Sequence, residues 1–319
     1  MKRPHVVLLG AGASRATCLN GDKFGRILPL MQDFVDVVGL RSLLQDLKIN
    51  PEANFEEIFS GLWENNETEK VTRLQKEIEK YFDRLELPDR PTIYDHLVLS
   101  LRPQDLIATF NWDPLLLEAY WRNGGVGLSL PRLAFLHGNI RVGYCEKDRV
   151  AGRSGAQCRH CGEQFTKAPL LYPIKKKNYS TNALIANEWK QLRWGFANAF
   201  TITVFGSSGP KTDQEAIEAM QGAWGEKNKR EMEQTALIIA PSQDENKATE
   251  NWDKFIHTHH YEIQKDFYDS WIARHPRRTG EAYWNQYMEA KFIENNPIPK
   301  DLDLPDLWKW FERFKKAEG

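Results

Sequence analysis

The chain has 319 residues, of which 41% are hydrophobic and 27% are charged, as in a globular protein of one large or two ordinary domains. Its formal net charge of −1 excludes a general electrostatic attraction to nucleic acid or to a membrane surface. Four cysteines argue against a disulfide scaffold, and no apolar run suits a membrane span or a secretory signal, so we expect a cytoplasmic protein.

Five short apolar segments have the pattern of strands that are buried on both faces of a sheet. They are residues 6–9, 105–110, 133–136, 201–205 and 236–240. Helical or long segments separate them. This alternation favours an α/β fold with a doubly wound, parallel, Rossmann-like sheet.

Two long interruptions of this pattern, residues 26–100 and 143–182, are predicted insertions that form a smaller lobe. The first carries helical apolar stripes over residues 54–63, 71–85 and 92–101, for which core packing is the expected role. An aromatic helix near residues 308–314 ends the chain after a proline-spaced linker. It is expected to dock either on the core of the protein or on a partner.

The first predicted strand runs directly into Gly10, Ala11, Gly12 and Ser14. Glycines here permit a sharp turn and a close approach of a phosphate to the backbone, and a serine can cap a following helix. The turn is one glycine short of the full dinucleotide-binding pattern. The sequence therefore leaves two readings, a nucleotide phosphate site and a merely tight strand–helix turn.

Small or polar residues follow three other strands. They are Asn111 and Asp113, then His137, then Gly206, Ser207 and Ser208. Each set has a structural alternative, because Asn and Asp cap helices, a buried histidine can be purely structural, and Gly-Ser runs form loops. Since ligands of parallel sheets lie at the carboxyl ends of strands, their joint placement predicts one shared site.

The ordered set Gly-Ala-Gly-Ala-Ser, Thr-Phe-Asn-Trp-Asp, Leu-His-Gly and Phe-Gly-Ser-Ser resembles the sirtuin family over about residues 4–242. More narrowly, it resembles the divergent bacterial branch that serves antiphage defence as NAD hydrolases. The resemblance implies a catalytic NAD-binding domain over residues 1–242. Residues 243–319 are then a helical, aromatic-rich extension.

The resemblance also implies a role for each motif residue. Gly10, Ala11, Gly12 and Ser14 would hold phosphates, and Gly206, Ser207 and Ser208 the adenosine side of NAD. Asn111 and Asp113 would lie near the nicotinamide ribose, with His137 as the active-site histidine. These residue types suit cleavage of the nicotinamide–ribose bond, because an amide orients hydroxyls or water, a carboxylate stabilises a cationic sugar and a histidine accepts a proton.

Two other functions stay open. A protein deacylase or ADP-ribosyltransferase is disfavoured, because the Pro-Asp-Phe-Arg-like run of the deacylase branch is missing and residues 25–29 read Gly-Arg-Ile-Leu-Pro. The second function that stays open is that of a non-catalytic subunit that senses NAD or ADP-ribose within an assembly.

Because an uncontrolled NAD hydrolase would be toxic, we expect its activity to be controlled by a homo-oligomer or by a partner. The resemblance implies a HerA-type ATPase as that partner.

The family's zinc module is degenerate in this chain, which has only Cys145, Cys158 and Cys161 in the second insertion. Zinc needs four ligands in a tetrahedron, and His160 is the only fourth ligand that the sequence suggests, in an awkward position. A ribbon without metal is the alternative. The basic runs at residues 175–177 and 277–278 are expected to be solvated surface.

Overall fold

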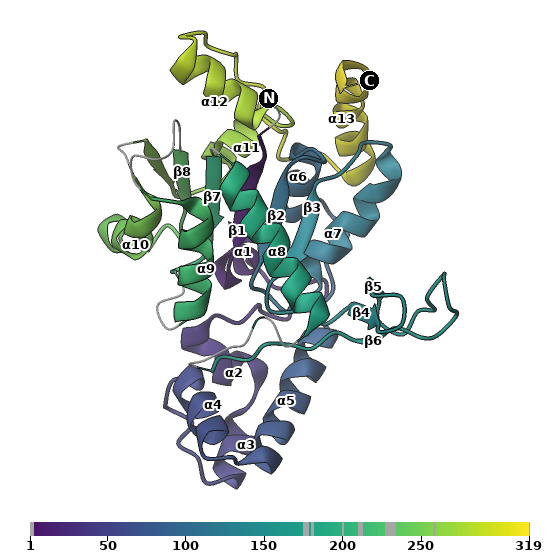
Figure 1. The fold of residues 1–319 in the computed structure, drawn as a ribbon, viewed down its shortest axis with the longest axis vertical. Coiled ribbons are helices and arrows are strands. Elements are labelled where there is room, and N and C mark those ends of the chain that lie inside the picture. Colours follow the sequence, from purple (N-terminus) through teal and green to yellow (C-terminus); the bar gives the residue numbers. More distant parts are fainter. Residues whose placement is uncertain are drawn as a thin grey trace.

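The computed structural model describes residues 3–174, 179, 182–199, 201–209, 213–226, 234–257 and 260–318. Its centre is a six-stranded sheet in the order β3-β2-β1-β7-β8-β9, in which every neighbouring pair is parallel (Figure 1). The strands are β1 His5–Leu9, β2 Leu106–Thr109, β3 Arg132–Phe135, β7 Thr201–Phe205, β8 Gln234–Ile238 and β9 Tyr261–Gln264. The predicted α/β class with a parallel, doubly wound sheet is confirmed.

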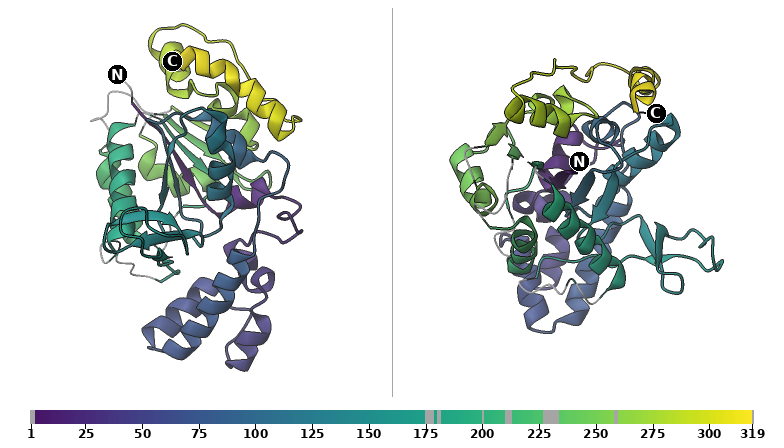
Figure 2. Two further views of the ribbon diagram at one scale, coloured as in Figure 1. Left: turned by 90° about the vertical axis from the view of Figure 1, so that its right-hand side faces the viewer. Right: turned by 45° about the horizontal axis from the view of Figure 1, so that its top comes forward.

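Helices cover both faces of the sheet, which explains why its central strands are apolar on both sides. Val7 and Leu9 pack in one core with α1, α6 and α7, whereas Val6 and Leu8 pack in a second core with α8, α9 and α10. The left view of Figure 2 shows helices on both sides of the sheet. The covering helices are α1 Ala11–Thr17, α6 Ile93–Ser100, α7 Leu115–Asn123, α8 Ala183–Asn198, α9 Gln214–Trp224, α10 Glu245–Trp252 and α11 Trp271–Arg274.

The first insertion forms a helical lobe beyond the carboxyl ends of the strands (Figure 1). Its helices are α2 Phe34–Val38, α3 Arg41–Asp46, α4 Phe55–Glu64 and α5 Thr68–Asp83. The rings of Phe34 and Phe55 stack with centroids 4.4 Å apart, and Phe82 meets Trp112 edge-on at 5.7 Å. The lobe is thereby joined to the loop that follows β2.

The second insertion contains a separate, three-stranded antiparallel ribbon in the order β5-β4-β6. Its strands are β4 Val142–Cys145, β5 Val150–Arg153 and β6 Thr166–Lys167. The ribbon projects to one side of the molecule next to α7 (Figure 1). The first insertion is thus helical and the second carries a β-ribbon, and the two meet where the ring of Tyr172 stacks on that of Phe59 with centroids 4.9 Å apart.

The sheet has one strand more than the five expected, because β9 lies beyond residue 242 and extends the sheet past β8. This strand escaped prediction because it is an edge strand in which Tyr261 and Ile263 alternate with Glu262 and Gln264, without the unbroken apolar run of the central strands. The division of the chain at residue 242 stays a prediction.

The last helices are α12 Thr279–Met288 and α13 Leu304–Glu318. Leu307 and Phe311 of α13 are fully buried, and the Trp308 indole donates to Asn123 Oδ1 of α7 at 2.7 Å. Of the two expectations for this aromatic helix, docking on the protein's own core is therefore confirmed. Among the described residues, no helix combines the length and apolarity that crossing a membrane requires.

The expectation of a solvated surface at residues 277–278 is wrong for Arg277, which is only 2% exposed. Its guanidinium donates to the Leu101 carbonyl oxygen at 2.8 Å and to Glu318 Oε2 at 2.5 Å. A fully paired guanidinium can be buried, and here it ties α13 to the end of α6. Arg278 is exposed as expected, and residues 175–177 lie outside the described residues.

Candidate active site at the carboxyl ends of the strands

The glycine-rich turn after β1 packs backbone against backbone with the turn after β7. The Gly10 amide donates to the Phe205 carbonyl oxygen at 3.0 Å, and the Gly12 amide donates to the Gly206 carbonyl oxygen at 2.8 Å. A Cβ atom on Gly10 or Gly12 would lie 2.7 or 2.8 Å from that Gly206 oxygen. The close approach of the two turns therefore explains why glycine stands at these two positions, whether or not a ligand binds there.

The outer residues of the same two turns are open to solvent. Ala11 and Ser208 are exposed, and Gly206 and Ser207 are half-buried. Ser207 Oγ accepts a hydrogen bond from the Gly209 amide at 3.3 Å, which closes the turn. A ligand at this edge would meet Ala11 and Ser208, the exposed residues of the two turns.

Behind these turns, four buried or half-buried side chains form a hydrogen-bonded set that we call the Ser14 cluster: Ser14, Tyr94, Asn111 and Asp113. Ser14 Oγ donates to Asp113 Oδ2 at 2.6 Å and lies 2.8 Å from the Tyr94 hydroxyl. Asn111 Nδ2 donates to Ser14 Oγ at 2.9 Å and to the Gly10 carbonyl oxygen at 2.9 Å. The predicted residues Ser14, Asn111 and Asp113 are thus brought together.

Asp113 lies deep in this cluster and is only 4% exposed. Its Oδ2 accepts from Ser14, and its Oδ1 accepts from the Leu115 amide at 3.1 Å, at the start of α7. Burial raises the pKa of Asp113 to about 6, because the charged carboxylate loses hydration there. Both carboxyl oxygens are therefore engaged in holding Ser14 and α7.

Asn111 differs from Asp113 in its exposure, because it is half-buried at the end of β2. Among the described residues, hydrogen bonds reach its Nδ2 and its backbone amide, which donates to Thr109 Oγ1 at 3.0 Å. The amide is fixed in one orientation by these bonds. Its Oδ1 is then the atom that can accept a hydrogen bond from a ligand or a water molecule.

His137 follows β3, the neighbour of β2, and belongs to a second set that we call the His137 cluster: His137, Tyr179 and Asp213. His137 Nε2 lies 3.3 Å from the Tyr179 hydroxyl and 3.6 Å from Asp213 Oδ2, and the Tyr179 hydroxyl donates to Asp213. Burial and the charge of Asp213 raise the pKa of Tyr179 well above its ordinary value, so the hydroxyl keeps its proton.

Three members of the two clusters were not predicted from the sequence. Tyr94 lies in an apolar helix, where its hydroxyl leaves no pattern, and Tyr179 lies in a segment without periodicity. Asp213 is the N-cap of α9 and accepts from the Ala216 amide at 3.1 Å, so its sequence signal is only that of a helix start. Only the folded chain reveals their contacts.

The polar, glycine-spaced sequence of residues 15–29 predicts a loop over the site. It begins inside α1 and continues as a loop that Asp22 holds together. Asp22 Oδ1 accepts from the amides of Phe24 and Arg26, and Oδ2 accepts from the Glu86 amide at 3.0 Å. The loop is therefore attached to the chain after α5, and whether it covers a ligand stays a prediction.

The ribbon gathers the predicted cysteines and one further residue. Cys145, Asp148, Cys158 and Cys161 offer ligand atoms that all lie within 4.8 Å of one another. Cys145 Sγ lies 3.5 Å from Cys161 Sγ, and Cys158 Sγ lies 3.1 Å from Asp148 Oδ2. The fourth position thus belongs to Asp148 and not to His160; the Cys-x-x-Asp spacing from Cys145 was the available signal. Three thiolates and a carboxylate form a donor set that fits a tetrahedral Zn²⁺.

Comparison with known proteins gives a likeness of fold. No protein-family model matches the sequence, and no curated protein is detectably similar to it. A Sir2 homolog in complex with NAD is 14% identical, with 99% of this chain and 91% of that chain covered and a TM-score of 0.44. Sir2Tm bound to a propionylated peptide is 14% identical, and a Sir2–p53 peptide–NAD⁺ complex is 16% identical.

In both peptide complexes the match covers 83% of this chain and 88% of that chain, with TM-scores of 0.38 and 0.37. Similarity of this degree concerns the overall fold alone. What these proteins bind does not transfer to this chain, so a proposal about function must depend on the two clusters.

Proposed function

We propose that this protein is an NAD hydrolase that cleaves the nicotinamide–ribose bond and releases nicotinamide and ADP-ribose. The observation that supports it is the pair of clusters at the ends of adjacent strands β2 and β3, beside the exposed glycine turns after β1 and β7. Such an edge of a parallel sheet suits a dinucleotide with its phosphates at the turns.

In this proposal Asn111 orients the attacking water or a ribose hydroxyl. Its Nδ2 is held by Ser14 and Gly10, so its Oδ1 has a defined direction before the substrate arrives. Preorganised acceptors of this kind lower the cost of reaching the transition state. Ser14 and Asp113 act through Asn111, since the bonds of Asp113 end on Ser14 and on the start of α7.

His137 acts as the proton acceptor, and Asp213 is a positioning residue for it. As the C1′–N bond breaks, its electron pair goes to the nicotinamide nitrogen, and the water oxygen bonds to C1′. One water proton then passes to His137 and on to solvent, which balances the reaction. The carboxylate 3.6 Å from Nε2 favours the protonated ring, and the Tyr179 hydroxyl fixes that carboxylate.

The decisive experiment follows nicotinamide and ADP-ribose formation from NAD with the purified full chain, alone and with the product of its genomic neighbour. The proposal expects equal amounts of the two products without any acyl peptide, and lower turnover by Asn111→Ala. Deacylation would instead make nicotinamide release depend on an acetylated peptide. NAD binding without turnover in both preparations would favour the sensor function.

The ribbon is proposed to hold one structural zinc ion through Cys145, Asp148, Cys158 and Cys161. The ion would supply no step of the reaction and would cross-link β4 to the loop before β6, since a ribbon this small has little core of its own. Metal analysis of the purified protein should give about one equivalent per chain, and Asp148→Ala should lower metal affinity about 10-fold or more. A content far below one equivalent would contradict the site.

Other parts of the interpretation stay predictions from the resemblance: the antiphage role, the homo-oligomer, the HerA-type ATPase partner and the cytoplasmic location. None of them is needed for the chemistry at the two clusters. The turnover assay with and without the neighbouring gene product also tests whether activity requires a partner.

A further inference from the structure

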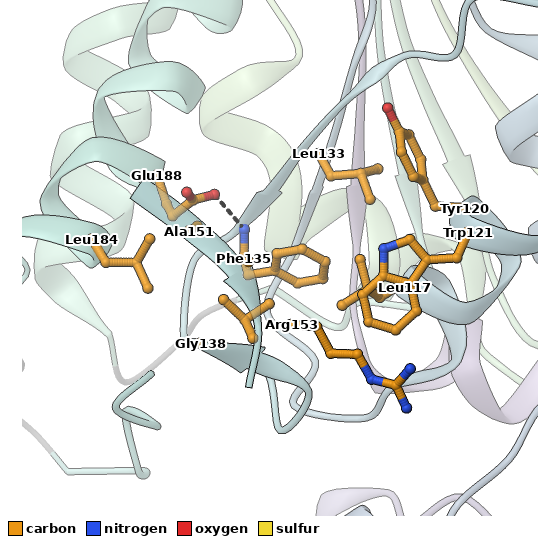
Figure 3. A pocket seen from close by; sticks show the side chains of 12 residues that line it. Leu117, Tyr120, Trp121, Leu133, Phe135, Gly138, Ala151, Arg153, Leu184 and Glu188 are labelled. Carbon is orange, nitrogen blue, oxygen red and sulfur yellow. Dashed lines mark hydrogen bonds between the residues drawn. The ribbon is translucent and has the colours of Figure 1, made fainter. Parts of the chain in front are cut away.

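A cavity of about 610 Å³ lies at the outer edge of β3, apart from the Ser14 cluster. Its residues come from α7, β3, the ribbon strands β4 and β5, α8 and Gly138, which follows His137 in the chain. Six of them carry the argument: Leu117, Trp121, Phe135, Arg153, Leu184 and Glu188. In Figure 3 the α8 side chains face those of α7 across the Phe135 ring. A volume of this size is typical of sites for small molecules.

The floor of the cavity is apolar and buried. Leu117, Phe135 and Leu184 are 7%, 8% and 5% exposed, respectively. The entrance is different, because Trp121 is 41% exposed and the guanidinium carbon of Arg153 lies 5.6 Å from the centre of its ring. A flat apolar molecule would therefore bury its body against Phe135 and stack at the Trp121–Arg153 pair.

One charged group interrupts this apolar surface. Glu188 is 8% exposed, and its Oε2 accepts from the Phe135 amide at 2.8 Å, as the dashed line in Figure 3 shows. Within the described residues, no other group donates to this carboxyl group. Burial raises the pKa of Glu188 to about 7, which reflects the cost of a poorly solvated carboxylate. A donor placed against Oε1 would reduce that cost.

We infer that this cavity binds a small aromatic molecule that donates an N–H hydrogen bond to Glu188. The aromatic rings of Trp121 and Phe135 select a flat body, and the buried carboxylate selects the donor. An extended peptide is disfavoured as the occupant, because Glu188 already takes the outward amide of Phe135 that an added strand would use. The site is independent of the proposed NAD hydrolysis, and its ligand need not be a nucleotide.

The test compares indole with 1-methylindole, which has the same ring system without the N–H donor. Each would be titrated into the full chain in the absence of NAD, with binding followed by ligand-detected NMR. We expect indole to bind about 10-fold more tightly than 1-methylindole, since of the two ligands only indole can donate a hydrogen bond to Glu188. Equal affinities, or no binding of indole up to its solubility limit, would overturn the inference.

Variants then locate the site. Glu188→Gln should weaken indole about 10-fold, because the amide that replaces one oxygen is itself a donor, whereas the exposed Lys190→Gln on the same helix should change nothing. Leu184→Trp should abolish binding by filling the cavity. Unchanged indole affinity in either cavity variant overturns the inference. If one of them does not fold, the other variant and the ligand pair on the wild-type chain still decide.

Discussion

The two clusters at the carboxyl ends of the strands use similar groups in different ways. In the Ser14 cluster, Asp113 is 4% exposed and bonded through both carboxyl oxygens at distances of 2.6 and 3.1 Å. In the His137 cluster, the His137 side chain is 13% exposed, and its Nε2 lies 3.3 and 3.6 Å from its partners. The carboxylate of the first set is bonded through both oxygens, whereas the histidine of the second set is partly exposed and lies farther from its carboxylate.

Because of this difference, we expect the Ser14 cluster to position other groups and the His137 cluster to take part in the reaction. In the Ser14 cluster, Ser14 and Asp113 are buried and bonded to other described groups, and the half-buried Asn111 is the member that a substrate can reach. A histidine with long contacts can still shorten them around a substrate, as catalytic groups often do. The contrast predicts that substitutions in the Ser14 cluster change stability first, and that substitutions in the His137 cluster change turnover first.

The largest effect is expected for His137→Ala. Loss of a general base should lower turnover of NAD about 10²-fold to 10⁴-fold, with little change in stability because the ring is partly exposed. Nicotinamide release and thermal unfolding are measured together. His260→Ala, at the amino end of β9, is the control and should retain activity. Full activity of His137→Ala would remove the histidine from the mechanism.

Ser14→Ala should destabilise the protein by about 2–4 kcal/mol, because it leaves the Asp113 carboxylate, the Tyr94 hydroxyl and the Asn111 amide without a shared partner. Urea unfolding measures this. The exposed Ser208→Ala should change stability by less than about 0.5 kcal/mol. If Ser14→Ala lost as little stability as Ser208→Ala, the cluster would not contribute to the stability of the fold.

Asp113 provides the pH test of the same cluster. Folding raises its pKa from 3.8 to about 6, so the native state holds a proton that the unfolded chain has released. The stabilisation that this proton gives the native state is present below the unfolded pKa and is lost as the pH rises through about 6. Asp113→Asn has no such proton to lose. The free energy of unfolding of Asp113→Asn, relative to that of the wild type, should therefore rise by about 1–3 kcal/mol as the pH is raised from 4 to 7. A parallel pH dependence of the two proteins would contradict the assigned pKa.

The smallest effect is expected for Asp213→Asn, which removes the charge near His137 and keeps the shape. Turnover should fall about 10-fold, and the acidic limb of the pH profile of kcat/KM should move to lower pH, because the neutral partner no longer stabilises the imidazolium. A structural defect alone would lower activity without moving that limb. The exposed Asp253→Asn is the matched control.

Local sequence patterns determined much of this protein. Unbroken apolar runs specified five of the six strands, because strands buried on both faces must be apolar throughout. They also located Ser14, Asn111, Asp113 and His137 at strand ends, since parallel connections bring those ends to one edge. The same reasoning missed β9, an edge strand without that pattern, and assigned buried Arg277 to the surface because a charge run does not reveal its partners.

The pairing of side chains from distant segments was decided only by the tertiary structure. Tyr94 reaches Ser14 across 80 positions, and Glu188 meets the Phe135 amide across 53. Asp148 joins the three cysteines only because the ribbon folds β4 back on β5. Hydrogen bonds and ligand sites depend on distances of a few ångströms, which local propensity does not encode. The sequence therefore determined which strand ends carry polar groups, and the fold decided which of them are held in place and which can reach a ligand.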